Sequence, residues 1–157
     1  MSHASDLADR SLHCLPVSCC GLGKRNEPPT GLTLTNINSF FFPPGARLEF
    51  DTVVTNKGSL NPVSNSVIAE EAGLYLISYS ASVVGPPLAP IPNPLRIVLR
   101  VNALAIGAQT ADSPAEISDS VVVSLKAGDV VDLINSGSTA LAYLPGTTPH
   151  LTIVRPA

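Results

Sequence analysis

Short stretches of the chain alternate between apolar and polar residues with a period of two, which is typical of β-strands that have one face buried. In the clearest run, residues 74–84, every second side chain from Tyr75 to Val83 is apolar. The positions between them include Ser78, Ser80 and Ser82. This pattern predicts a long strand with one apolar face and one small, polar face.

Shorter runs with the same period occur at residues 32–37, 95–102, 120–125, 131–133 and 151–153. In the second of these runs, Leu95, Ile97, Leu99 and Val101 are expected to point inward, and Arg96, Val98 and Arg100 outward. In the run at 131–133, the alternation places Asp132 on a solvent-facing side. β-branched residues dominate these segments, which favours strands.

Residues that favour turns separate the apolar runs. They include Asn56-Lys-Gly58, Asn61-Pro62, Gly85-Pro-Pro87, Asp112-Ser-Pro114, Gly128-Asp129 and Pro145-Gly146. The 15 prolines would interrupt helices but are compatible with loops between strands. Many short strands with regularly spaced turns indicate a sandwich or barrel. We therefore predict an all-β protein, a jelly-roll β-sandwich of about eight to ten strands over residues 31–157.

Residues 1–30 show no sustained period and become rich in proline and glycine, which predicts an extended N-terminal arm. The arm holds all three cysteines, Cys14, Cys19 and Cys20. An odd number of clustered cysteines favours disulfides between subunits. Adjacent cysteines do not easily pair with each other, because a vicinal disulfide is strained. Unused thiols in a reducing cytoplasm are the alternative. A zinc site with His13 is disfavoured, because no second half-site follows.

Composition and charge narrow the possible functions. The chain is 45% hydrophobic but only 13% charged, which suggests additional burial against a partner. Its net charge is −3 and it has no basic cluster, so nucleic-acid binding is disfavoured. No apolar stretch reaches the length of a membrane span. Asp6 and Asp9 occur where a secretory signal would be apolar. We therefore expect synthesis in a cytoplasm without a signal peptide.

No motif for catalysis is present. The chain contains no nucleophile elbow, zinc-protease pair, Walker loop or dinucleotide-binding glycine motif. His3 and His13 lie in the arm, and His150 stands alone before the last predicted strand. Glu70 and Glu71 are adjacent, so their side chains would diverge in a strand. We predict that the protein is not an enzyme and uses no cofactor or metal.

Two features could serve contacts between subunits. Phe40, Phe41 and Phe42 are consecutive, so in a strand at least one ring must face away from the others. The exposed ring could pack against a neighbouring subunit or receive its arm, or both faces could be covered within the domain. The serine row at 78, 80 and 82 could permit close approach of another sheet or could face solvent. We predict subunit-interface contacts for Phe40, Phe41, Phe42, Tyr75 and Tyr79.

Residues 50–134 carry an ordered set of short motifs. They are Phe50-Asp51, Asn56-x-Gly58, Ala72-Gly73-Leu-Tyr75-Leu-Ile-Ser-Tyr79, Arg100-Val-Asn102 and Leu125-Lys-Ala-Gly128-Asp129-Val-Val131-Asp-Leu133. This order resembles the jelly roll shared by tumour necrosis factor and the globular head of complement component one-q. Within that superfamily, it is most similar to bacterial endospore surface proteins of the exosporium and of spore appendage fibres.

The resemblance implies a homotrimer with a structural or adhesive role and no catalytic residues. The expected function is self-assembly into a spore-surface layer or appendage fibre, through contacts of the arm and intermolecular disulfides. The expected partners are other copies of the chain and other spore-surface proteins. The expected location is the bacterial spore surface, either exosporium or appendage. The alternative is a trimeric adhesin or lectin-like binding head.

Overall fold

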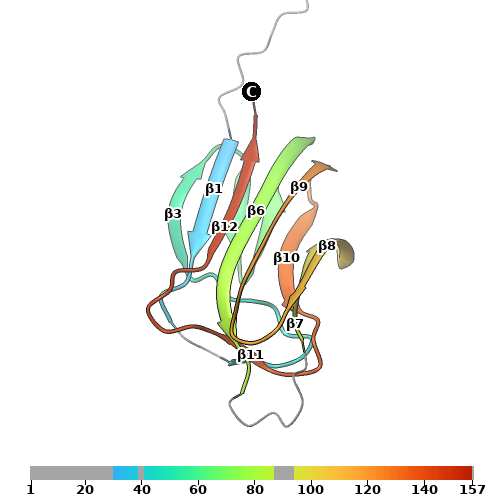
Figure 1. Cartoon of the computed structure of the whole chain (residues 1–157). Helices are drawn as coiled ribbons and strands as arrows, with labels where there is room; N and C mark the ends of the chain where they lie inside the picture. Colours follow the sequence, from blue (N-terminus) through green and yellow to red (C-terminus); the bar gives the residue numbers. More distant parts are fainter. Residues whose placement is uncertain (1–29, 39–40, 87–93, 157) are drawn as a thin grey trace, which may run out of the picture.

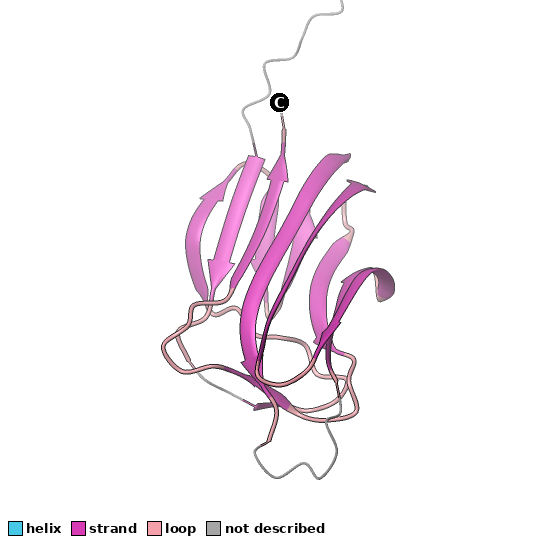
Figure 2. Cartoon of the chain, viewed as in Figure 1, coloured by secondary structure: helices cyan, strands magenta, loops and turns pink. Residues whose placement is uncertain are grey.

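The protein is described by a computed structural model, which covers residues 30–38, 41–86 and 94–156. These residues form twelve strands and no helix (Figure 2). In chain order the strands are β1 (Thr30–Thr35), β2 (Phe41–Phe42), β3 (Thr52–Lys57), β4 (Leu60–Val63), β5 (Ser66–Ala69), β6 (Gly73–Val84), β7 (Leu95–Val101), β8 (Leu104–Ala111), β9 (Ala115–Leu125), β10 (Val130–Asn135), β11 (Leu141–Tyr143) and β12 (His150–Arg155).

The strands form two antiparallel sheets that pack face to face (Figure 1). The first sheet has the order β3-β1-β12-β6, with β9 on the far side of β6 and the short β11 and β2 continuing beyond the end of β12. The second sheet has the order β4-β5-β10-β7-β8. The chain passes repeatedly from one sheet to the other, for example from β3 to β4 and from β5 to β6, as in a double-sheet jelly roll. The prediction of an all-β jelly-roll sandwich is confirmed.

The predicted long strand at 74–84 is β6, the longest strand of the first sheet. It pairs with β9 in an unbroken antiparallel register from Gly73↔Leu125 to Val83↔Ala115. Its other edge pairs first with β12 and then with β11. β6 therefore joins most of the first sheet, which explains why this strand carries the strongest alternation in the sequence.

The core lies between the two sheets and follows the predicted alternation. All five alternating apolar side chains of β6, from Tyr75 to Val83, are buried. They pack against inward-facing residues of the second sheet, including Leu95, Ile97 and Leu99 of β7. Burial of these side chains supplies the main stabilisation of the fold. Val101 is only partly buried, because it lies at the end of β7 beside a turn.

Two hairpins are closed by tight turns that require a left-handed backbone. Ser64 and Asn65 connect β4 to β5 with φ values of 34° and 65°, and Asn102 and Ala103 connect β7 to β8 with φ values of 49° and 67°. Two positive-φ residues in a two-residue loop are typical of a type I′ turn, which matches the twist of the flanking strands. The turn predicted at Asn61-Pro62 is wrong: both residues lie within β4, an edge strand that tolerates proline.

A buried amide holds the loops at one end of the sandwich together. Asn135, at the end of β10, donates hydrogen bonds from its Nδ2 to the carbonyl oxygens of Phe42 and Thr139, both at 2.8 Å. Its Oδ1 accepts a hydrogen bond from the Gly137 backbone N–H at 3.0 Å. Every side-chain polar atom of this fully buried residue therefore has a partner.

The predicted boundary between arm and domain falls next to the start of β1. The strand begins at Thr30 and ends at Thr35, whereas the alternation predicted residues 32–37. The difference arises because β1 pairs with β12 from Thr30↔Arg155 to Thr35↔His150, and this pairing depends on the tertiary fold. Residues 1–29 of the predicted arm lie outside the described residues, and Thr30, predicted as the last residue of the arm, belongs to β1.

Candidate interaction surface

The outward-facing side chains of the first sheet form regular rows, because directly paired residues of antiparallel strands lie on the same face. Across β1, β12, β6 and β9, one row is apolar and consists of Gly31, Val154, Leu76 and Val122. The next row consists of hydroxyl residues, namely Thr33, Thr152, Ser78 and Ser120. Neither row contains a charged residue. We call these two rows the outer face.

Large apolar side chains are exposed on this face. Leu76 and Val122 are paired and are 40% and 62% exposed, and the nearby Leu74 is 53% exposed. They face outward because side chains alternate between the two faces of β6 and β9, and neighbouring residues such as Tyr75 and Ile77 point into the core. A contiguous apolar group beside a row without charges is typical of a surface that is covered by another protein.

The structure places the predicted interface residues in different environments. Phe41 is 64% exposed, whereas Phe42 is buried and contacts the Tyr143 ring edge-to-face at 5.0 Å between centroids. Tyr75 and Tyr79 point inward and are buried in the core of the single chain. Phe40 lies outside the described residues, as do Cys14, Cys19 and Cys20. Interface contacts at these positions stay predictions.

The hydroxyl of Tyr79 is unusual among the core side chains. Its oxygen is buried without a hydrogen-bond partner among the described residues. Burial raises the pKa of this phenol above its ordinary value, and the negative charge of Asp119 on the paired strand raises the pKa further. The Tyr79 phenol is therefore neutral at ordinary pH, and the side chain forms part of the core.

The outer side of the second sheet carries a charged cluster instead of an apolar row. Asp132 of β10 accepts hydrogen bonds from Nε and Nη2 of Arg100, at 2.7 and 2.8 Å. Nε of Arg47 lies 2.8 Å from the second carboxylate oxygen. The Asp132 side chain is only 4% exposed, so the predicted solvent-facing position is wrong. The residue faces outward, but the two arginines cover it.

The ion pair with Asp132 changes the pKa of Arg100. The hydrogen bond that Arg100 donates to Asp132 raises the pKa of Arg100 above its ordinary value, and the negative charge of the carboxylate adds to this effect. Arg100 lies directly opposite Asp132 in the pairing of β7 with β10. The cluster therefore links three segments of the second sheet, and its charges are largely satisfied internally, so it offers little to an external partner.

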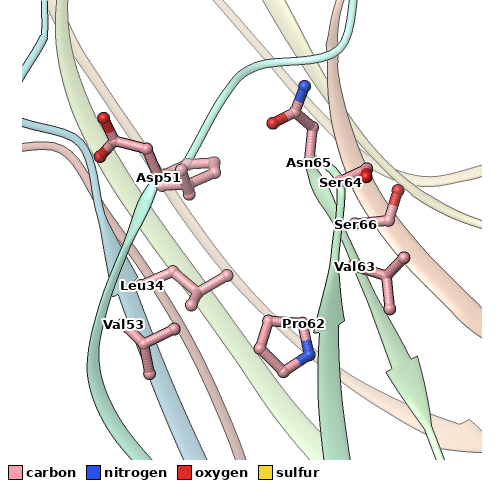
Figure 3. A pocket seen from close by; sticks show the side chains of 9 residues that line it. Leu34, Asp51, Val53, Pro62, Val63, Ser64, Asn65 and Ser66 are labelled. Carbon is pink, nitrogen blue, oxygen red and sulfur yellow. The ribbon is translucent and has the colours of Figure 1, made fainter.

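A groove of about 280 Å³ opens at the side of the sandwich where β3 of the first sheet lies opposite the β4–β5 hairpin (Figure 3). Leu34 and Val53 line one wall, and Pro62 lines the other. Asp51 and Asn65 lie on opposite sides at one end. The combination of apolar walls and a carboxylate suits a small ligand, or a side chain, that carries a hydrogen-bond donor.

The turn between β9 and β10 is held by a carboxylate. Asp129 accepts hydrogen bonds from the backbone N–H of Lys126 and from Nδ2 of Asn102, both at 2.8 Å. The hydrogen bond from the Lys126 backbone lowers the pKa of Asp129, and the bond from Asn102 lowers it further. The carboxylate thus ties this turn to the neighbouring β7–β8 hairpin.

This arrangement predicts a specific loss of stability in acid. A carboxyl group whose pKa is lowered by folding stabilises the protein above its ordinary pKa, here 3.8, and loses this effect as the pH falls through the lowered value. We expect Asp129→Asn to be less stable than wild type at pH 6, with the difference shrinking towards pH 2. Urea unfolding midpoints across this pH range measure the effect. A difference that is constant with pH would contradict the role of the carboxylate.

Within the described ranges, no three His, Cys, Asp or Glu side chains are grouped so that they could coordinate a metal ion. No membrane-spanning helix exists among the described residues.

Sequence patterns did not reveal the most specific of these interactions. Asp132 and Arg100 meet only because β10 pairs with β7, and Asn135 meets Phe42 across 93 residues of sequence. The alternation at 95–102 and 131–133 correctly placed Arg100 and Asp132 on outward faces. A search for opposite charges on outward positions of neighbouring strands is the signal that could have suggested the pair.

The chain was compared with known proteins. No family model and no curated protein matches its sequence. Solved structures do match its fold. The crystal structure of murine APRIL at pH 5.0 has a TM-score of 0.59 and 17% sequence identity, covering 82% of this chain and 99% of that chain. The structure of Eiger TNF from S. frugiperda has a TM-score of 0.58 and 15% identity, covering 82% and 92%. Rabbit GITRL has a TM-score of 0.52 and 22% identity, covering 80% and 94%.

These likenesses extend over nearly the full length of the matched chains. They show that residues of this chain adopt the jelly roll of tumour-necrosis-factor-like proteins, as the sequence motifs predicted. Because the identities are low, they establish the fold alone.

Proposed function

We propose that this protein is a structural protein that assembles as a homotrimer through the outer face of its first sheet. The observation that carries the proposal is the uncharged pair of rows, in which Leu76 and Val122 are exposed, with the exposed Leu74 beside them. A flat sheet face with small hydroxyl residues permits close approach of a second chain, and its apolar row favours removal from water. The fold shared with the tumour-necrosis-factor-like jelly rolls supports a trimer.

The trimers are then the units of a larger assembly. The arm with Cys14, Cys19 and Cys20 reaches a neighbouring trimer and is joined to it by intermolecular disulfides. A head-to-tail contact of this kind does not close on itself, so it propagates into a fibre or layer. We place this assembly at the bacterial spore surface, in the exosporium or in an appendage, because of the sequence resemblance to such proteins.

Light scattering with and without a reducing agent tests the proposal. We expect a molar mass of three 16.2 kDa chains under reduction and much larger species after oxidation. Serine variants of the three cysteines are the matched control, and they should remain trimers under both conditions. A monomer under both conditions would exclude self-assembly as the function.

A single substitution tests the location of the interface. Leu76→Glu places a carboxylate in the centre of the apolar row without disturbing the core, because the side chain points outward. We expect the dissociation constant of the trimer to rise about 100-fold, since burial of an unpaired charge costs several kcal/mol. Val63→Glu is the control, because Val63 is similarly exposed but lies on β4 of the second sheet. Equal effects of both variants would argue against this interface.

The groove beside β3 favours a second candidate function, a trimeric adhesin or lectin-like binding head. Asp51 at the groove is held by hydrogen bonds from Asn38 and Thr52, which orients its carboxylate for a ligand. This function requires a trimer but no disulfide-linked polymer. A mass of three chains in both oxidising and reducing buffer would favour it over the fibre or layer.

A further inference from the structure

Gly31 is a glycine that the fold of the single chain does not require. It lies inside β1, paired with Val154 on one side and with Lys57 on the other. Its backbone is not in the left-handed region. A Cβ added to Gly31 would meet no atom within 4 Å. Neither conformation nor internal packing therefore explains the absence of a side chain.

Other glycines of the protein have clear reasons to be glycine. Gly58 has a φ of 83°, and its Cβ would collide with the side chain of Thr30. At Gly107, a Cβ would lie 2.9 Å from a carboxylate oxygen of Asp119. Gly31 lacks such a reason, although glycine weakens a strand because it loses more backbone freedom on folding and packs no side chain. A glycine inside a strand also marks a place where another chain can approach the backbone closely.

The missing side chain leaves a notch in the outer face. The notch has a volume of about 280 Å³ and is lined at its rim by Thr33, Thr55, Lys57 and Val154. Gly31 and Val154 are also the first two members of the apolar row, so the notch is continuous with the exposed Leu76 and Val122. The volume is sufficient for a protruding side chain together with part of its backbone.

We propose that the notch at Gly31 receives a segment of a second copy of this chain and sets the register between subunits. This inference rests on the proposed trimer, whose outer face the notch adjoins. A second copy is the occupant that the surface favours, because the notch extends the apolar row of that face.

Filling the notch provides the test. Gly31→Val adds a side chain that suits a strand, so the variant should fold and its isolated chain should be at least as stable as wild type. We expect the trimer dissociation constant to rise about 10-fold or more, because overpacking of an interface is destabilising. Gly31→Ala should show a smaller rise. Thr110→Val is the control, because Thr110 is an exposed strand residue on β8 of the second sheet, away from the outer face.

The measurements are molar mass by light scattering over a dilution series and far-UV circular dichroism for the fold. The notch is supported by a native spectrum together with strongly weakened association for Gly31→Val, a smaller weakening for Gly31→Ala and unchanged association for Thr110→Val. Unchanged association in both glycine variants would overturn it while leaving the trimer in place. Loss of the fold in Gly31→Ala would also overturn it, because the glycine would then serve the single chain. A wild-type protein that is monomeric throughout would remove the proposed trimer and this inference with it.

Discussion

Asp132→Ala is expected to lower the free energy of unfolding by about 3 kcal/mol, because it leaves buried charge without a partner. The carboxylate accepts hydrogen bonds from Arg100 at 2.7 and 2.8 Å and lies 2.8 Å from Nε of Arg47. Arg100 is mostly covered, with its side chain 20% exposed, whereas Arg47 is 50% exposed and can be hydrated. Most of the loss should therefore come from Arg100. Urea unfolding at a fixed protein concentration measures it.

Removing both partners should cost less than removing the carboxylate alone. In the double variant Arg100→Met and Asp132→Leu, no charge of this pair remains buried, and apolar side chains of similar size replace the pair. Asp112→Ala is a control, because Asp112 is exposed and its loss should change stability by no more than about 0.5 kcal/mol. If the double variant were as unstable as Asp132→Ala, packing rather than unpaired charge would explain the loss.

Asn135→Ala is expected to destabilise the protein by about 2–4 kcal/mol, because it leaves buried backbone groups without hydrogen bonds. The Asn135 amide supplies both donors that reach the carbonyl oxygens of Phe42 and Thr139, and it accepts the N–H of Gly137. The methyl group of alanine cannot replace any of these bonds. The change in urea midpoint gives the magnitude.

Two further variants separate this effect from a general sensitivity to asparagine loss. Asn61→Ala removes an exposed asparagine from β4 and should be nearly neutral. Asn135→Asp keeps the shape but replaces a donor with an oxygen that faces two carbonyl oxygens, so it should be at least as destabilising as alanine. A mild effect of Asn135→Asp would show that the donors contribute little.

Alternation with a period of two is a local property, so it predicted the strands that bury one face. The runs at 74–84 and 95–102 correspond to β6 and β7, and the inward positions of β6 are all buried. No alternation predicted β8, Leu104–Ala111, because its residues are mostly small and its burial follows no regular pattern. β8 is held by pairing with β7, which depends on the hairpin at Asn102 and Ala103.

The candidate surface was foreseen only in outline. The serine row at 78, 80 and 82 indicated a face with small side chains, and the structure places two of these residues in rows that cross the sheet to His150 and Thr152. Of the aromatic residues predicted for the interface, Tyr75 and Tyr79 lie in the core of the single chain, whereas Phe41 is exposed. The apolar row could not be predicted, because its members come from four strands whose register is set by the fold.

The sequence by itself determined that this protein is an all-β jelly-roll sandwich, and which faces of its main strands are apolar. These properties depend on the spacing of residues within one segment. The tertiary structure decided which residues of different strands meet: Arg100 with Asp132, Asn135 with Phe42, and Gly31 with Val154, Leu76 and Val122 in one row. Such contacts join positions far apart in sequence, and their register follows from closing the two sheets over one core.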